Sequence, residues 1–74
     1  MERIIEILKR IRPDIDVESM NFIEDGSLDS LDTLRLISEL EEKYSITIES
    51  GDIVPENFAN IDAISKLINR LKSA

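Results

Sequence analysis

SLDTLRLISELEEKY, residues 30–44, has the most regular spacing of apolar side chains in this chain. Apolar residues recur every three or four positions, which predicts an amphipathic α-helix over the whole stretch. The predicted apolar stripe consists of Leu31, Leu34, Ile37, Leu40 and Tyr44, and Leu36 widens it. The predicted solvent-facing side consists of Asp32, Arg35, Glu39 and Glu42. Asp29 or Ser30 is expected to cap the first turn, where acidic side chains suit the positive end of the helix dipole.

Two further segments have helical spacing. In residues 2–12 the expected stripe consists of Ile4, Ile5, Leu8 and Ile11, with Ile7 at its edge. Pro13 disfavours a helical conformation in the residue before it, so this helix should stop at Arg12. In residues 61–72 the expected stripe consists of Ile61, Ile64, Leu67, Ile68 and Leu71, with Asn60 or Asp62 available at its start.

The connections between these segments are less regular. Residues 13–29 have no clean period, and a loop of this length is usually functional or packs with its own side chains. We expect its apolar residues to hold the loop against the helices: Ile15, Val17, Met20, Phe22, Ile23 and Leu28. Asp25-Gly26 indicates a turn. A short strand at residues 15–17 is the alternative, although no partner strand stands nearby.

The fold class follows from this order of segments. Residues 45–50 alternate as a strand does, but one such segment in so short a chain favours an extended link. One helical turn is expected around Asp52-Ile53-Val54. The chain, residues 1–74, is therefore predicted to be a single all-α domain. It is a small bundle of three long helices plus a short fourth, with a long loop between the first and second helices.

Charge and composition exclude several classes of function. The net charge is −7, and residues 13–32 contain seven acids and no base. Such a chain is not expected to bind nucleic acid, and its field should steer basic partners toward its middle. Ordinary solubilising surface charge is the alternative explanation. Without a long apolar run or a signal-peptide pattern, a cytoplasmic monomer with no membrane span is expected.

The sequence contains almost none of the residue types and motifs that catalysis or metal binding usually requires. The chain has no histidine and no cysteine, so a Ser–His–Asp triad and a thiolate metal site are impossible. The acidic loop lacks the ligand pattern of an EF-hand, and no glycine-rich phosphate loop is present. We expect neither enzymatic activity nor a metal site. Ser30 is then either a simple helix cap or a residue to which another enzyme attaches a group.

The run Asp29-Ser30-Leu31-Asp32-Thr33-Leu34, followed by Leu40-Glu41-Glu42-Lys43-Tyr44, resembles the acyl carrier protein family. The resemblance covers essentially the whole chain. In that family an Asp-Ser-Leu motif opens the second helix, and its serine carries 4'-phosphopantetheine through a phosphodiester. The resemblance implies that a phosphopantetheinyl transferase modifies Ser30, which makes the chain a phosphoprotein. The arm would then carry acyl or aminoacyl groups as thioesters.

The resemblance also implies partner enzymes with basic patches: a loading ligase and downstream transferases or synthases. The residues expected to contact them are Asp29, Leu31, Asp32, Leu34, Glu41 and Glu42. Fatty-acid, polyketide, nonribosomal-peptide and D-alanine-type pathways all remain open. Gly26 lies three residues before Asp29, as in D-alanyl and peptide-synthetase carriers, and Arg35 stands where fatty-acid carriers commonly have Glu.

The sequence leaves two questions open. The first is the cargo: a fatty-acid carrier should have a cavity lined by Ile37, Ile46, Ile53 and Leu67, whereas an aminoacyl carrier should have a tighter core with its cargo in solvent. The second is the function itself, because the chain could instead be a non-covalent acidic helical interaction module in which Ser30 is only a helix cap.

Overall fold

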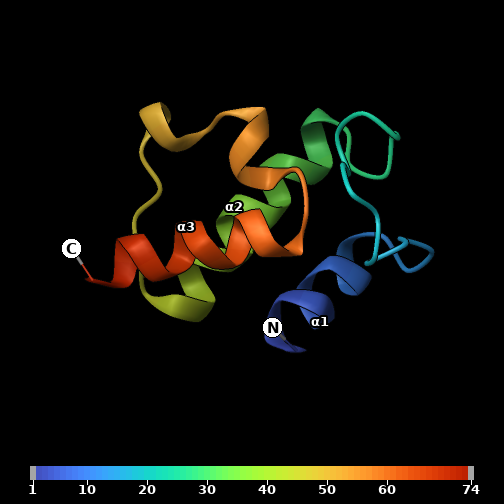
Figure 1. Cartoon of the computed structure of the whole chain (residues 1–74). Helices are drawn as coiled ribbons and strands as arrows, with labels where there is room; N and C mark the ends of the chain where they lie inside the picture. The colour runs from blue at the N-terminus through green and yellow to red at the C-terminus, as the bar shows by residue number, and fades with distance from the viewer. Residues whose placement is uncertain (1, 74) are drawn as a thin grey trace.

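The computed structural model describes residues 2–73, and this part of the chain contains helices and no strand. Its elements follow one another along the chain (Figure 1) as α1 (Glu2–Ile11), α2 (Ser30–Tyr44), the 3-10 helices η1 (Ser50–Asp52) and η2 (Pro55–Phe58), and α3 (Ile61–Ser73). The prediction of an all-α fold with a long loop between the first two helices is confirmed.

Two short 3-10 helices, η1 and η2, stand where a single short helical turn was predicted. A turn was expected around residues 52–54, but η1 ends at Asp52, and Val54 is extended, with φ −127° and ψ 150°. Pro55 then starts η2, because its fixed φ suits the first position of a helix. The first helix ends at Ile11, one residue before the predicted end, and the last helix extends to Ser73.

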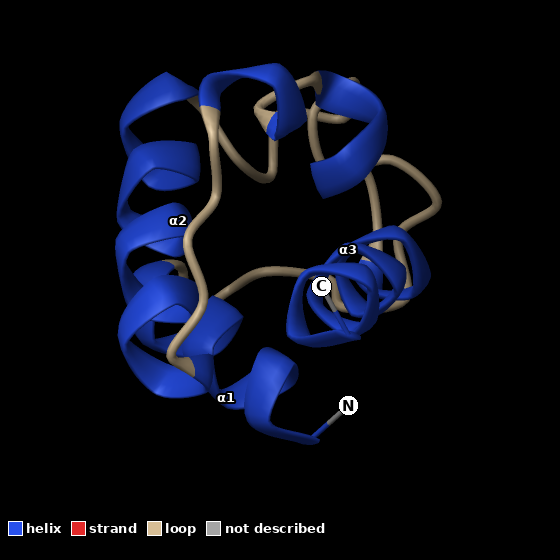
Figure 2. Cartoon of the chain, turned by 90° about the vertical axis from the view of Figure 1, so that its left-hand side faces the viewer, coloured by secondary structure: helices blue, strands red, loops and turns tan. Residues whose placement is uncertain are grey.

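Helices α1, α2 and α3 surround one hydrophobic core, which lies between them (Figure 2). Every element contributes to it except η1, and the buried apolar residues are Ile4, Ile7, Leu8, Ile15, Phe22, Leu28, Leu36, Ile37, Leu40, Ile48, Phe58, Ile64, Leu67 and Ile68. The predicted stripe of α1 needs one correction. Ile7 is buried in the core, and Ile5 is the residue at the edge.

Five of the six apolar residues expected to hold the loop between α1 and α2 pack in or against the core: Ile15, Val17, Phe22, Ile23 and Leu28. The loop contains no strand at residues 15–17. Phe22 is fully buried, and its backbone N–H donates a hydrogen bond to the carbonyl of Ala59. The carbonyl of Phe22 in turn accepts from the N–H of Leu28 at 3.0 Å. The prediction is wrong for Met20, which is 83% exposed.

The residue after α2, Ser45, caps the helix in a left-handed conformation, with φ 53° and ψ 48°. This conformation lets the N–H groups of Ser45 and Ile46 both reach the carbonyl of Glu41. The side chain of Glu41 also accepts a hydrogen bond from the N–H of Ile48 at 2.8 Å. The extended link after α2 is therefore fixed by Glu41, and Ile48 enters the core.

Replacing Ser45 by glycine is expected to raise the free energy of unfolding by about 0.5–1 kcal/mol, because glycine adopts the left-handed conformation without a Cβ penalty. Urea unfolding followed by circular dichroism measures the change. Ser38→Gly is the matched control, since Ser38 is an exposed serine inside α2. Glycine there should lower stability by about 0.5 kcal/mol. A loss of stability in Ser45→Gly would contradict the observed end of α2.

Candidate functional site

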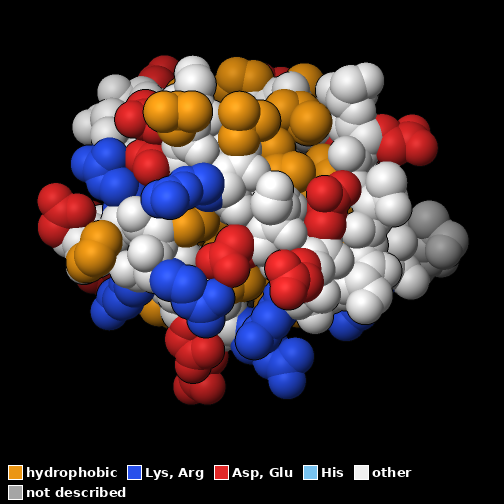
Figure 3. Space-filling model, turned by 180° about the vertical axis from the view of Figure 1, so that it is seen from behind, with side chains coloured by type: hydrophobic (Ala, Val, Ile, Leu, Met, Phe, Trp, Pro, Cys, Tyr) orange, Lys and Arg blue, Asp and Glu red, His pale blue; other side chains and the backbone are white. Residues whose placement is uncertain are grey.

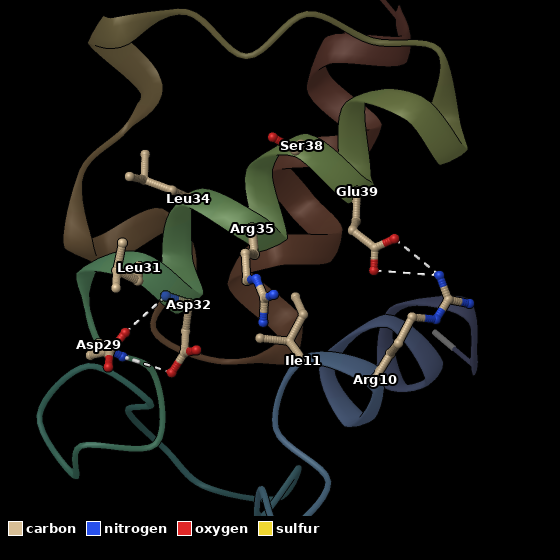
Figure 4. Close-up of a pocket in the computed structure, with 9 residues that line it drawn as sticks. All are labelled: Arg10, Ile11, Asp29, Leu31, Asp32, Leu34, Arg35, Ser38 and Glu39. Atoms are coloured by element: carbon tan, nitrogen blue, oxygen red, sulfur yellow. Dashed lines mark hydrogen bonds and ion pairs between the residues drawn. The ribbon is translucent and has the colours of Figure 1, made fainter.

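The start of α2 is closed by a reciprocal pair of hydrogen bonds. Asp29 Oδ1 accepts from the N–H of Asp32 at 2.8 Å, and Asp32 Oδ2 accepts from the N–H of Asp29 at 3.3 Å (Figure 4). This arrangement is a capping box in which Asp29 is the N-cap residue. Asp29 rather than Ser30 therefore caps α2, which decides the choice that the sequence left open.

Ser30 is the first residue of α2, and it is exposed. No hydrogen bond to its side chain is present within residues 2–73. The hydroxyl lies at the N-terminus of a 15-residue helix, where unpaired N–H groups and the helix dipole favour an anion. The fold thus leaves this hydroxyl accessible to another molecule, in surroundings that suit a bound phosphate group.

Asp32 is buried, with 8% of its surface exposed, although the sequence placed it on the solvent-facing side of the helix. Arg12, which follows α1, explains the difference, because its Nη1 lies 2.9 Å from Asp32 Oδ2. The hydrogen bond and charge of Asp32 raise the pKa of Arg12, and Asp14, 3.8 Å from Arg12 Nε, acts in the same direction. This ion pair ties the end of α1 to the start of α2.

The turn before the site is organised by Asp25. Its carboxylate accepts hydrogen bonds from the hydroxyl of Ser19 and, at 2.8 Å, from the N–H of Ser27. The bonds from Ser19 and Ser27 lower the pKa of Asp25. Gly26 has φ +80°, a left-handed conformation that favours glycine. The predicted Asp25-Gly26 turn therefore exists, and it leads the chain into the start of α2.

The two leucines next to Ser30 do not belong to the core. Leu31 is 72% exposed and Leu34 is 58% exposed, whereas the predicted stripe included both. The core face of α2 is formed instead by residues further along the helix: Leu36, Ile37 and Leu40. Leu31 and Leu34 are thus available for contact with another molecule.

The two glutamates that are expected to contact partner enzymes, Glu41 and Glu42, lie in different surroundings. Glu41 is half-buried, and its carboxylate is already engaged by the N–H of Ile48. Glu42 is exposed and lines a shallow pocket with Ile7 and Arg10 of α1. Of the four acidic residues expected to contact partners, Asp29 and Glu42 are exposed, Glu41 is half-buried and Asp32 is buried.

An open pocket of about 570 Å³ lies beside Ser30. Three segments line it: the loop before α2, the first turn of α2, and residues 53–58. The fatty-acid alternative placed Ile53 in a cavity between the helices, but Ile53 is 41% exposed and lines this surface pocket together with Pro55. The role of Pro55 at the site was missed, because no periodic pattern covers residues 51–59.

The family model described as "phosphopantetheine attachment site" matches residues 1–68. The chain belongs to this family of phosphopantetheine-binding carrier proteins. The D-alanyl carrier proteins of Listeria welshimeri and Listeria monocytogenes are each 30% identical to it, over 96% of this chain and 95% of theirs. Aminoacyl carrier protein 1 of Bradyrhizobium diazoefficiens is 29% identical, over 89% of this chain and 78% of its own length.

No solved structure matches the chain. Among residues 2–73, no helix has the length and apolar character needed to cross a membrane.

Proposed function

We propose that this chain carries acyl or aminoacyl groups on a 4'-phosphopantetheine arm attached to Ser30 and presents them to partner enzymes. One observation carries the proposal. Ser30 is exposed at the start of α2, and its hydroxyl forms no hydrogen bond with the residues that the structure describes, because Asp29 caps the helix. An exposed serine that does not cap its helix has no such structural role to compete with modification.

The attachment step needs a separate transferase. A bond forms between Ser30 Oγ and the β-phosphorus of coenzyme A, the pyrophosphate bond breaks, and adenosine 3',5'-bisphosphate leaves. The serine proton must go to a base of the transferase, since the nearest carboxylates of this chain, Asp29 and Asp32, are engaged in the capping box and with Arg12. The chain itself contributes position and no catalytic group.

The arm would supply a thiol, which a chain without cysteine lacks. The chain's own contribution is to hold a phosphodiester at the N-terminus of α2, where N–H groups and the dipole stabilise negative charge. A tether of this kind raises the effective concentration of a bound group near each partner enzyme. We further propose that the chain carries its cargo in the cytoplasm and as a monomer.

An aminoacyl cargo is the finer proposal, with a dedicated ligase and a D-alanine-type or related pathway. The relatives named above are D-alanyl and aminoacyl carrier proteins, which supports it. The packing supports it too. Of the residues expected to line an acyl cavity, Ile37 and Leu67 are buried in one hydrophobic cluster and Ile46 packs against that cluster. Ile53 lies at the surface. A small polar cargo requires no cavity between the helices.

Incubation with coenzyme A and a broad-specificity phosphopantetheinyl transferase is expected to add one phosphopantetheinyl group to the wild-type chain, as measured by intact mass. Ser30→Ala should gain none, because the exposed and unbonded hydroxyl proposed as the acceptor is removed. Ser38→Ala is the matched control, since Ser38 is another exposed serine of the same helix, and it should be modified as the wild type is.

The same variants separate modification from capping. Ser30→Ala should change the free energy of unfolding by less than about 0.5 kcal/mol, whereas Asp29→Ala should lower it by about 1 kcal/mol. A folded wild-type chain of unchanged mass would refute the carrier function. A Ser30→Ala variant that still gains the group would refute the site.

A further inference from the structure

Within residues 2–73, two ion pairs join α2 to α1 and to the residue that follows α1. Oppositely charged side chains lie next to one another over much of the face seen in Figure 3, so their pattern alone does not single out either pair. Arg10 binds Glu39 at 3.0 Å in the second half of α2 (Figure 4), and Arg12 binds Asp32 at 2.9 Å in its first turn. Arg10 is exposed, whereas Arg12 is half-buried and Asp32 is buried. Water and salt screen a buried pair less, so the pair at the start of α2 should be the stronger one.

A single oxygen of Asp32 links Arg12 to the backbone just before Ser30. Asp32 Oδ2 accepts a hydrogen bond from Arg12 Nη1 and also one from the N–H of Asp29, at 3.3 Å. The other polar groups of Asp29 are held as well. Its Oδ1 accepts from the N–H of Asp32, and its carbonyl accepts from both the N–H and the hydroxyl of Thr33 at 2.9 Å. The backbone of Asp29 is thus fixed on both sides, and Ser30 follows it directly.

The two carboxylates next to Ser30 differ in what they bind. Asp29 is exposed, and its carboxylate accepts from a backbone N–H and forms no ion pair within residues 2–73. Asp32 is buried and binds Arg12, whose pKa is raised first by the hydrogen bond and charge of Asp32 and also by the charge of Asp29. The contact that holds the first turn from outside the helix therefore goes through Asp32, and it comes from a residue twenty positions earlier.

We propose that Arg12 is a positioning residue for attachment of the arm: it holds Asp32, and Asp32 fixes the backbone of Asp29, so that the Ser30 hydroxyl reaches the transferase in one orientation. This inference rests on the function proposed above. Asp32 then acts inside the chain, as the link between Arg12 and Asp29, and not as a contact for a partner enzyme. Because a misplacement of about 1 Å can slow a reaction about 100-fold, a loosened first turn should slow transfer even in a folded chain.

Transfer kinetics and amide exchange test the proposal together. Arg12→Gln and Arg12→Lys are compared with the wild type and with two controls, each shown by circular dichroism to be folded at the assay temperature. Arg10→Gln also removes one positive charge and one ion pair with α2, but away from its first turn. Ile68→Val lowers global stability through the core of α3 without touching the turn.

Two quantities are measured for each variant. Intact mass gives kcat/KM for transfer of the arm from coenzyme A by the broad-specificity transferase. Nuclear magnetic resonance of the unmodified chain gives the exchange rates of the N–H groups of Asp32 and Thr33, both of which bond to Asp29. These groups lie in the first turn of a helix, where exchange reports local opening and not global unfolding.

Arg12→Gln should lower kcat/KM at least about tenfold and speed exchange at Asp32 and Thr33 at least about fivefold. Arg12→Lys should lower kcat/KM about threefold, because a point charge does not reproduce the guanidinium fork. Arg10→Gln and Ile68→Val should stay within about twofold of the wild type in both measurements.

The inference is overturned if Arg12→Gln is modified within twofold of the wild-type rate, or if either control loses as much. It is also overturned if transfer slows without faster exchange, since Arg12 would then act on the transferase directly. If Arg12→Gln does not fold, Arg12→Lys decides, and modification within twofold of the wild type overturns the inference. If the wild type never gains the arm, it is the carrier function that fails, and the exchange rates, which need no arm, still report whether Arg12 holds the turn.

Discussion

Phe22→Ala is expected to lower the free energy of unfolding by about 3–5 kcal/mol, which is the usual cost of removing a fully buried aromatic side chain. Phe22 is 0% exposed, and its backbone bonds both to Ala59 and to Leu28. It therefore ties the long loop to the segment before α3 and to the approach to α2. Since small domains have only about 5–15 kcal/mol of stability, this variant should be substantially unfolded at moderate urea concentrations.

Met20→Ala is the control for this change. Met20 lies two residues earlier in the same loop, but it is exposed, so its loss should change stability by less than about 0.5 kcal/mol. Urea titration followed by far-ultraviolet circular dichroism measures both variants. Equal effects of the two substitutions would mean that the loop is not held as the structure has it.

Asp32→Ala is expected to lower the free energy of unfolding by about 2 kcal/mol. The substitution removes the acceptor of the Asp29 N–H and leaves the Arg12 guanidinium without its nearest partner. Hydrogen bonds to charged groups contribute about 1.5–3 kcal/mol, and a lost cap costs about 1 kcal/mol, although the two effects overlap here. The same urea titration measures the change.

Asp14→Ala provides the comparison, because Asp14 is the other carboxylate near Arg12. Its side chain is 85% exposed and lies farther away, at 3.8 Å, so the expected loss is below about 0.5 kcal/mol. A double-mutant cycle with Arg12→Gln should show coupling to Asp32 and little to Asp14. The absence of coupling to Asp32 would contradict the link between α1 and the start of α2.

The three long helices could be predicted from the sequence because their apolar residues repeat at helical spacing. Which apolar residues face the core could not. Helix α2 has apolar side chains at more positions than one face can bury, so periodicity alone did not separate Leu31 and Leu34 from Leu36 and Ile37. For the same reason, the prediction put Ile5 in the apolar stripe of α1 and Ile7 at its edge, whereas Ile7 is the buried residue and Ile5 lies at the edge.

The candidate site was predicted in part. The Asp-Ser-Leu motif led to the prediction that Ser30 is the attachment site. Asp29 and Ser30 were both good caps, and only the hydrogen bond between Asp29 and Asp32 decides between them. The burial of Asp32 depends on Arg12, which lies twenty residues earlier in the chain. The surface position of Ile53 likewise depends on where η1 ends, which no local pattern specified.

Localising the added group within the wild-type chain tests the central claim most directly. The chain is treated with coenzyme A and the transferase, digested, and analysed by fragment-ion mass spectrometry of the peptide that spans the start of α2. The account predicts that the phosphopantetheinyl group lies on Ser30 and on no other residue of that peptide. A group found on Ser27 or Thr33, or a peptide that remains unmodified in a folded chain, would contradict it.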